Sequence, residues 1–338
     1  MTPRGCPLVA VLGAVVVGCA GAGAVQLDQL PASPVALVWR SEALALDRVD
    51  ALRDLEKRQA GQPLREGIAQ VEDLEALLGG RPDLERRLTS LQGQLVLLDP
   101  RSGERTPLEG APAAARPLAW SPDRTRLLLA ARWRDAAQLF VWDRATGVAE
   151  IVTAGPEEHP MGCLAADGRV VAVEMDRAGA LARLVTWPAG GGARVGLTEG
   201  PWHVQPACSP VGPQVAFVTV GPDGAPQVAV IDLERPRATR VVAHGHAPVF
   251  APDGAWILYA GRSAAGQRLW RVRADGTGRT PVGAGLLEEG HPAVSPDGRY
   301  VAYVAVDDDR RERVWVRRFD GSGDRPLVGQ GDGAWPAW

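Results

Sequence analysis

The sequence predicts an all-β fold, a six-bladed β-propeller, from three observations. A turn motif recurs at near-constant spacing, with its proline or the equivalent residue at positions 122, 166, 210, 252 and 296. Short apolar runs separated by further turns flank every copy, as expected of three to four short strands per unit. The two ends of the chain carry complementary parts of one more unit. A repeat of this length without helical periodicity is typical of propeller blades.

The recurring turn has a physical basis in its residue types. Proline presets φ at the second turn position, aspartate hydrogen-bonds its own backbone, and glycine accepts positive φ. We therefore expect structural roles for these aspartates. The copies are Ser121-Pro122-Asp123, Ala165-Ala166-Asp167-Gly168, Ser209-Pro210, Ala251-Pro252-Asp253-Gly254 and Ser295-Pro296-Asp297-Gly298.

The spacing also predicts how the ring closes. The next turn proline would fall at position 340, and residues 335–338 match the run that precedes the turn in the other copies. Residues 95–103 match residues 139–147 and so supply the outer strands that this terminal strand lacks, while residues 35–39 supply the second strand. A blade shared between the N- and C-terminal strands leaves no free sheet edge. Five complete blades and this closing blade make six.

The predicted organisation has five parts. Residues 1–18 form a signal peptide, 19–32 a linker, 33–40 the N-terminal strand of the closing blade, 41–92 a small helical insertion and 93–338 the propeller blades. The insertion is predicted from apolar residues at helical spacing. These residues are Leu64, Ile68, Val71 and Leu74, and after Gly79-Gly80 also Leu84, Leu88 and Leu91.

The N-terminus resembles the signal of a bacterial lipoprotein. Arg4 precedes an apolar stretch over residues 7–17, which is too short to span a bilayer. The sequence Val16-Val17-Gly18-Cys19 is similar to a lipobox, in which cleavage before the cysteine is coupled to its diacylation. Acylated Cys19 would hold the protein on the lipid bilayer, facing the periplasm. Ala20, in place of the aspartate that retains many lipoproteins at the inner membrane, favours the outer membrane. The alternative is a plain signal peptide cut near Ala22 or Ala24.

Composition argues against several classes of function. The chain has 338 residues, 46% of them hydrophobic, and a net charge of -3, so it can bury a large core and shows no basic excess for nucleic acid. Lys57 is the single lysine, which excludes a Gly-Lys-Ser/Thr phosphate loop, and no Gly-x-Ser-x-Gly elbow is present. The run Asp307-Asp308-Asp309 predicts a solvated loop, with a calcium or partner contact as the alternative. We expect a monomer without catalytic residues, metal or cofactor.

Two cysteines remain once Cys6 leaves with the signal peptide and Cys19 takes the lipid. Cys163 and Cys208 lie three and two residues before their turn markers, on the inner strands of neighbouring blades. Because side chains alternate between sheet faces, this offset predicts that the two point to opposite faces. We therefore expect buried free thiols rather than a disulfide, although an oxidising compartment would permit the bridge.

All five histidines fall five to eight residues before a turn marker, in the connection between the outer strand of one blade and the inner strand of the next. In propellers these connections line one mouth of the central channel, so the histidines are candidates for binding at the channel rim. One interpretation is that they form hydrogen bonds to neighbouring blades and fill the space where the blades converge towards the central axis. The alternative is a rim that binds a ligand or metal. The candidates are His159, His203, His244, His246 and His291, with Arg116 and Trp335 at equivalent places.

The repeat is similar to that of the TolB-like six-bladed propellers. The similarity rests on the Ser-Pro-Asp-Gly turn at 295–298, the Arg-Tyr-Val-Ala-Tyr strand at 299–303 and their counterparts over residues 93–338. TolB is a periplasmic protein that binds partners of the Tol-Pal envelope system through its propeller, and it has an N-terminal α/β domain that this chain replaces with the predicted insertion.

The resemblance implies a non-catalytic scaffold at the cell envelope that binds envelope proteins, including peptidoglycan-associated ones. The alternative is a small-ligand or metal sensor, or an enzyme, that uses a His-lined channel mouth, as some lyases and cyclases with propeller folds do.

Overall fold

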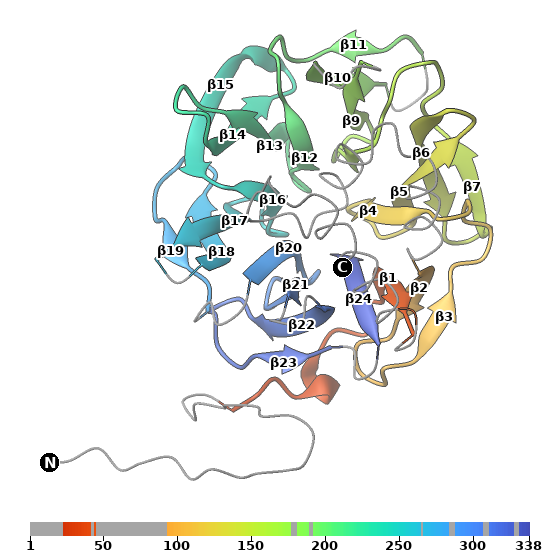
Figure 1. Ribbon diagram of the computed structural model, residues 1–338, viewed down its shortest axis with the longest axis vertical. Helices are drawn as coiled ribbons and strands as arrows, with labels where there is room; N and C mark the ends of the chain where they lie inside the picture. The colour runs from red at the N-terminus through yellow and green to blue at the C-terminus, as the bar shows by residue number, and fades with distance from the viewer. Residues whose placement is uncertain are drawn as a thin grey trace, which may run out of the picture.

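The computed structural model describes residues 23–41, 44, 93–176, 181–188, 192–264, 266–283, 288–306, 311–327 and 331–338. The strands in these ranges form six four-stranded antiparallel sheets, arranged as blades around a central axis (Figure 1). The predicted six-bladed propeller is therefore confirmed.

Five blades each use one stretch of chain. Blade 1 contains β4 (Arg116–Trp120), β5 (Arg126–Trp133), β6 (Ala136–Asp143) and β7 (Val148–Ile151). Blade 2 contains β8 (Gly162–Leu164), β9 (Val170–Met175), β10 (Ala182–Trp187) and β11 (Val195–Gly196). Blade 3 contains β12 (Val204–Cys208), β13 (Gln214–Val220), β14 (Pro226–Asp232) and β15 (Arg235–His244). Blade 4 contains β16 (His246–Phe250), β17 (Trp256–Ser263), β18 (Gly266–Arg273) and β19 (Thr280–Pro281). Blade 5 contains β20 (Glu288–Val294), β21 (Tyr300–Val306), β22 (Glu312–Arg318) and β23 (Arg325–Pro326).

Blade 6 joins the two ends of the chain, as predicted. Its order is β24 (Asp332–Ala337), β1 (Val35–Arg40), β2 (Gln94–Leu98) and β3 (Arg105–Pro107). The C-terminal strand pairs with β1 through Ala36 opposite Ala337, and β1 pairs with β2 through Val35 opposite Leu98. The short 3-10 helix η1 (Leu27–Gln29) precedes this blade. The predicted helical insertion at 41–92 lies outside the described residues, apart from Ser41 and Leu44.

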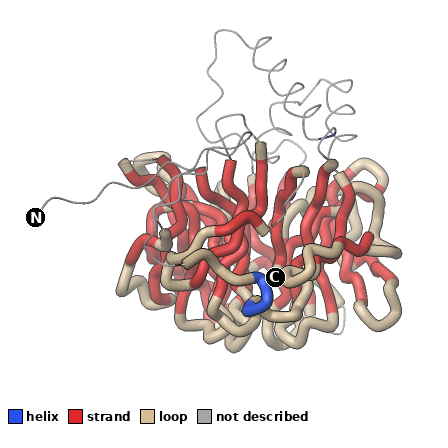
Figure 2. The backbone as a smooth tube through the Cα atoms, turned by 90° about the horizontal axis from the view of Figure 1, so that it is seen from below, coloured by secondary structure: helices blue, strands red, loops and turns tan. Residues whose placement is uncertain are grey.

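The antiparallel order of each blade gives the ring two faces (Figure 2). The turn face carries the turns between the first and second strands and between the third and fourth strands. The connection face carries the loops between the second and third strands and the links from one blade to the next. Arg40 and Gln94, which bracket residues 41–93, lie at the connection face because they sit where β1 ends and β2 begins.

The repeated turn is held by the hydrogen bonds that its residue types suggest. The Ser295 hydroxyl donates to Asp297 Oδ1 (2.6 Å), and the Tyr300 amide donates to Ser295 Oγ (2.9 Å). Gly298 adopts φ +70°, a left-handed conformation that glycine takes without a steric penalty. In the first copy Arg124 takes this place at φ +62°. The aspartates therefore fix turns, as expected.

The hydrophobic core is divided among the blade interfaces. Six clusters of buried apolar side chains are found among the described residues, one between each pair of neighbouring blades. Leu128 of blade 1 and Leu164 of blade 2, for example, belong to one cluster. Burying a leucine or valine side chain stabilises a fold by roughly 1.5–3 kcal/mol. Each blade is therefore held mainly by packing on its two neighbours.

Candidate functional site

A cavity of about 460 Å³ occupies the turn-face end of the central channel. Its wall contains a proline four residues before the turn marker in four of the six blades. Each of these prolines follows a residue with φ between +47° and +52°, where the register of the inner strand shifts. Proline lacks an amide hydrogen, so it suits such a bulge, and its ring gives this part of the cavity wall a stiff, apolar surface. The prolines are Pro206, Pro248, Pro292 and Pro336.

The residues predicted to form the channel rim do not line this cavity. Arg116 instead bridges three blades, because its guanidinium donates to the Pro160 carbonyl (2.7 Å) and lies 5.9 Å from the ring centre of Trp335. His291 and Trp335 occupy equivalent bulge positions of their inner strands, at φ +47° and +49°. Through these contacts, Arg116 and Trp335 join neighbouring blades. Their role in binding a ligand stays a prediction.

His159 is buried between blades 1 and 2, with only 1% of its surface exposed. Its Nδ1 lies 3.1 Å from Gln138 Oε1, which also accepts a hydrogen bond from the Thr153 hydroxyl. Nδ1 therefore carries the proton, and Nε2 faces the Glu174 carboxylate at 3.8 Å. Burial lowers the pKa of His159 to about 4. The imidazole is thus neutral at physiological pH and packs edge-on against Trp187.

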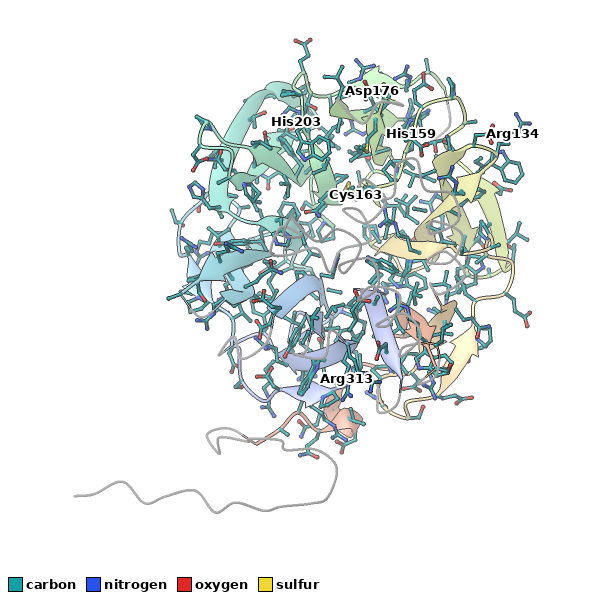
Figure 3. All side chains as sticks on the ribbon, viewed as in Figure 1. Arg134, His159, Cys163, Asp176, His203 and Arg313 are labelled. Carbon is teal, nitrogen blue, oxygen red and sulfur yellow. A yellow bond between two sulfur atoms is a disulfide. The ribbon has the colours of Figure 1, made fainter. Side chains whose placement is uncertain are left out.

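The other histidines occupy separate places. His203 packs edge-on against Phe217 with ring centres 5.1 Å apart, and burial lowers its pKa. His246 bonds through Nε2 to Gln267 Oε1 at 2.9 Å, and His244 is exposed at the end of β15. His159 and His203 lie farther from the ring centre than Cys163 does (Figure 3). Within the described ranges, no group of three or more His, Cys, Asp or Glu side chains could hold a metal ion.

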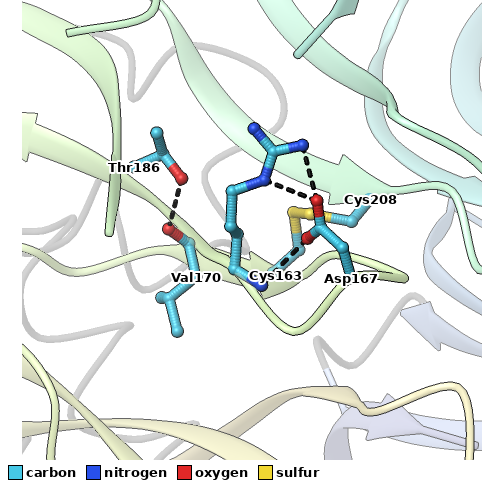
Figure 4. Close-up of a disulfide and its surroundings, with 6 residues drawn as sticks. Cys163, Asp167, Val170, Thr186 and Cys208 are labelled. Carbon is cyan, nitrogen blue, oxygen red and sulfur yellow. Dashed lines mark hydrogen bonds and ion pairs between the residues drawn. A yellow bond between two sulfur atoms is a disulfide. The ribbon is translucent and has the colours of Figure 1, made fainter. Parts of the chain in front are cut away.

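Cys163 and Cys208 form a disulfide, contrary to our prediction (Figure 4). Their Cα atoms are 5.5 Å apart, and the bond joins the inner strands of blades 2 and 3. The prediction was wrong because neighbouring blades present opposite sheet faces to each other.

The same one-residue offset, counted from the turn markers of two neighbouring blades, recurs at other blade interfaces. The residue two before the marker of one blade packs against the residue three before the marker of the preceding blade. Such pairs are Trp120 with Ala337, Phe250 with Ala207 and Trp338 with Ala293. Cys208 and Cys163 occupy these paired positions, so the one-residue offset brings them together.

Among the described residues, four large apolar side chains are exposed on the connection face of blades 1 to 3, and the repeat pattern did not predict them. We call them the connection-face apolar residues: Trp133 (49% exposed), Leu181 (55%), Trp202 (36%) and Val220 (46%). Trp202 and Leu181 are held close, because the residue after Leu181 pairs with Trp202 in a parallel bridge. A signal was present in the sequence, since Trp133 stands between two charged residues, Arg132 and Arg134, rather than in an apolar run.

Cys19 and the predicted signal peptide lie outside the described residues. Among the residues that the structure describes, no helical segment has the length and apolarity needed to cross a membrane.

The closed ring, with its shared blade and repeated aspartate turns, defines the class of six-bladed β-propellers. The profile of the TolB β-propeller domain matches residues 87–289, more than half of the chain. The chain therefore belongs to the TolB β-propeller domain family, as the repeat suggested.

Sequence identity with individual relatives is low. The curated "Uncharacterized protein Atu1656" of Agrobacterium fabrum is 27% identical over 152 residues, which are 40% of this chain and 50% of that protein. The chain thus matches about half the length of this relative. Solved TolB of Acinetobacter baumannii aligns with a TM-score of 0.63 and 15% identity, over 90% of this chain and 66% of that one. A TolB-type structure from Agrobacterium tumefaciens gives a TM-score of 0.58 and 22% identity, over 68% and 87% of the two chains. These similarities concern the fold.

Proposed function

We propose that this protein is a lipid-anchored, non-catalytic scaffold of the bacterial cell envelope that binds envelope proteins through the connection face of its propeller. Membership of the TolB β-propeller family supports an envelope location. The lipobox-like sequence that ends at Cys19 supports the anchor. Two acyl chains bury enough methylenes, at about 0.8 kcal/mol each, to hold a protein durably on a membrane.

The connection-face apolar residues carry the proposal of protein binding. Trp133 exposes its indole ring at the end of β5, and Trp202 exposes its ring in the link from blade 2 to blade 3. Tryptophan is enriched among residues that dominate binding energy. The other large apolar side chains that are exposed among the described residues lie on outermost strands or in a turn. Val148, Ile151, Val195 and Val241 lie on the outermost strands, and Val211 is in a turn.

Co-purification from envelope membranes tests this proposal, using protein with an intact Cys19 and the matched variants Val220→Ser and Val241→Ser. Both valines are in blade 3 and are 46% and 49% exposed, but Val220 is at the connection face and Val241 on the outermost strand. We expect Val220→Ser to reduce recovery of the partner several-fold and Val241→Ser to leave it unchanged. Equal recovery with both variants would contradict binding through this face.

The channel cavity supports the second candidate, a small-ligand sensor or enzyme. A wall of prolines around about 460 Å³ is within the range of small-molecule pockets, although the predicted histidines lie elsewhere. Calorimetry with zinc, copper and nickel, followed by a screen of small metabolites, separates the two functions. Tight binding of a metabolite together with failure to recover any protein partner would favour the sensor over the scaffold.

A further inference from the structure

The chain that follows the predicted lipidation site is built into the ring. The Val25 amide donates to the Gly323 carbonyl (3.0 Å), and Arg318 donates to the Gly23 carbonyl (3.0 Å). Val25 and Leu30 are fully buried and belong to the cluster between blades 5 and 6. The stretch that the sequence analysis assigned to a linker is therefore docked from Gly23 onward.

This docked segment runs along the turn side of blades 5 and 6. Three further donors hold its carbonyl groups: Arg101 Nε on Leu30 (2.5 Å), Trp338 Nε1 on Ser33 (3.1 Å) and Arg124 Nη2 on Pro34 (3.2 Å). Arg101, Arg124 and Gly323 all belong to turns of the turn face. Gly323, at φ +77°, lets the segment approach closely, because a Cβ there would lie 3.1 Å from the Gly23 oxygen. Figures 1 and 2 show η1 at the outer edge of these blades.

The remaining tether is short. Four residue steps separate Cys19 from Gly23, and an extended chain spans at most about 3.6 Å per residue, or about 14 Å in all. An eight-residue strand such as β5 is about 26 Å long. An acyl chain on Cys19 therefore cannot reach round the ring from the turn side of blade 5 to the connection face.

We propose that the turn side of blades 5 and 6 lies against the phospholipid surface and that the connection face of blades 1 to 3 points away from it. This orientation rests on the lipid anchor of the proposed function. It places Trp133, Trp202 and their neighbours on the part of the ring farthest from the bilayer. A partner protein would then bind at a fixed distance from the membrane surface.

Energy transfer to the membrane surface tests the orientation. Full-length lipidated protein is reconstituted in phosphatidylcholine–phosphatidylglycerol vesicles that carry a rhodamine-labelled headgroup. A donor dye is placed on Ser102→Cys, in a turn of blade 6, or on Asp135→Cys, in a connection-face loop of blade 1; both side chains are exposed. Only the introduced thiol reacts, because Cys163 and Cys208 are bonded to each other and Cys19 is acylated. We expect transfer from Ser102→Cys to be at least twice as efficient as transfer from Asp135→Cys.

A lengthened tether is the control. Thirty Gly/Ser residues inserted between Ala20 and Gly21 have a root-mean-square span of about 30 Å. We expect this insertion to abolish the difference between the two dyes, and a difference that persists would overturn the role of the short tether. Equal transfer in protein shown by mass spectrometry to be diacylated overturns the orientation but leaves the anchor intact. Absence of the acyl group overturns both.

Discussion

The turn face and the connection face of the ring are built on different principles. On the turn face, the same short motif recurs in blade after blade, and hydrogen bonds lower the pKa of Asp123, Asp143, Asp275 and Asp320. On the connection face, few positions repeat, and two tryptophans are exposed: Trp133 at the end of β5 and Trp202 in the link between blades 2 and 3. The repeated face supplies the scaffold, and the variable face is where we propose that a partner binds.

The two faces also respond differently to acid. A carboxylate with a lowered pKa stabilises the fold above its unfolded pKa of about 4 and loses this contribution as the pH falls through the folded value. His159, whose pKa is lowered by burial, behaves differently. The unfolded chain takes up a proton on this histidine before the folded protein does, so stability begins to fall at a higher pH than for the aspartates. The turn aspartates and His159 therefore affect stability in different pH windows.

The largest difference between the faces is expected from two tryptophans of blade 1. Trp120, at the turn end of β4, is 8% exposed and donates to the Ala337 carbonyl across the ring closure, whereas Trp133 is 49% exposed. Trp120→Ala should lower the free energy of unfolding by about 3–5 kcal/mol, because it leaves a cavity. Trp133→Ala should lower it by no more than about 1 kcal/mol, mainly through its edge contact with Phe140. Urea unfolding measures both, and equal losses would refute the distinction.

The disulfide gives the next largest effect. It joins cysteines that are 45 positions apart in the sequence, at the interface between blades 2 and 3. Replacing both Cys163 and Cys208 by Ala should lower the free energy of unfolding by about 2–4 kcal/mol, because the unfolded chain gains freedom. Wild-type protein unfolded under reducing conditions should show the same loss. A double variant as stable as oxidised wild type would show that packing alone holds this interface.

These two sites show how far the sequence could predict the structure. Position along the repeat was sufficient to predict the blades, the turns and the closing strand β1, because turn chemistry is local. The disulfide was missed because it depends on how two sheets face each other, which the alternation within one strand does not describe. The histidines share a place in the repeat, yet burial and different partners separate His159 from His246. Exposure of Trp133 likewise depends on packing that spacing does not reveal.

His159 should make stability depend on pH below neutrality. Its pKa is about 4 in the folded protein and about 6.5 in the unfolded chain, so the unfolded state binds more protons between these values. Stability should fall by up to about 3 kcal/mol as the pH drops from 6.5 to 4. His159→Gln, which keeps a donor for Gln138, should remove most of this slope. His244→Gln, at an exposed histidine, should retain it. The test is chemical unfolding at several pH values, and parallel slopes for both variants would contradict the assignment.

The smallest effect distinguishes two copies of the repeated turn. Burial alone would raise the pKa of Asp297, but hydrogen bonds from Ser295 and Arg299 outweigh it and lower the pKa. Asp253 occupies the equivalent place after Ala251, which has no hydroxyl, and accepts a hydrogen bond from the Ala255 amide. Asp297→Ala should therefore lower the free energy of unfolding by about 1 kcal/mol more than Asp253→Ala does at pH 7. The difference should vanish in the Ser295→Ala background, because the bond from the Ser295 hydroxyl to the Asp297 carboxylate is then already lost. A difference that survives in that background would assign the extra stability to Arg299, whose guanidinium lies 2.9 Å from the same carboxylate.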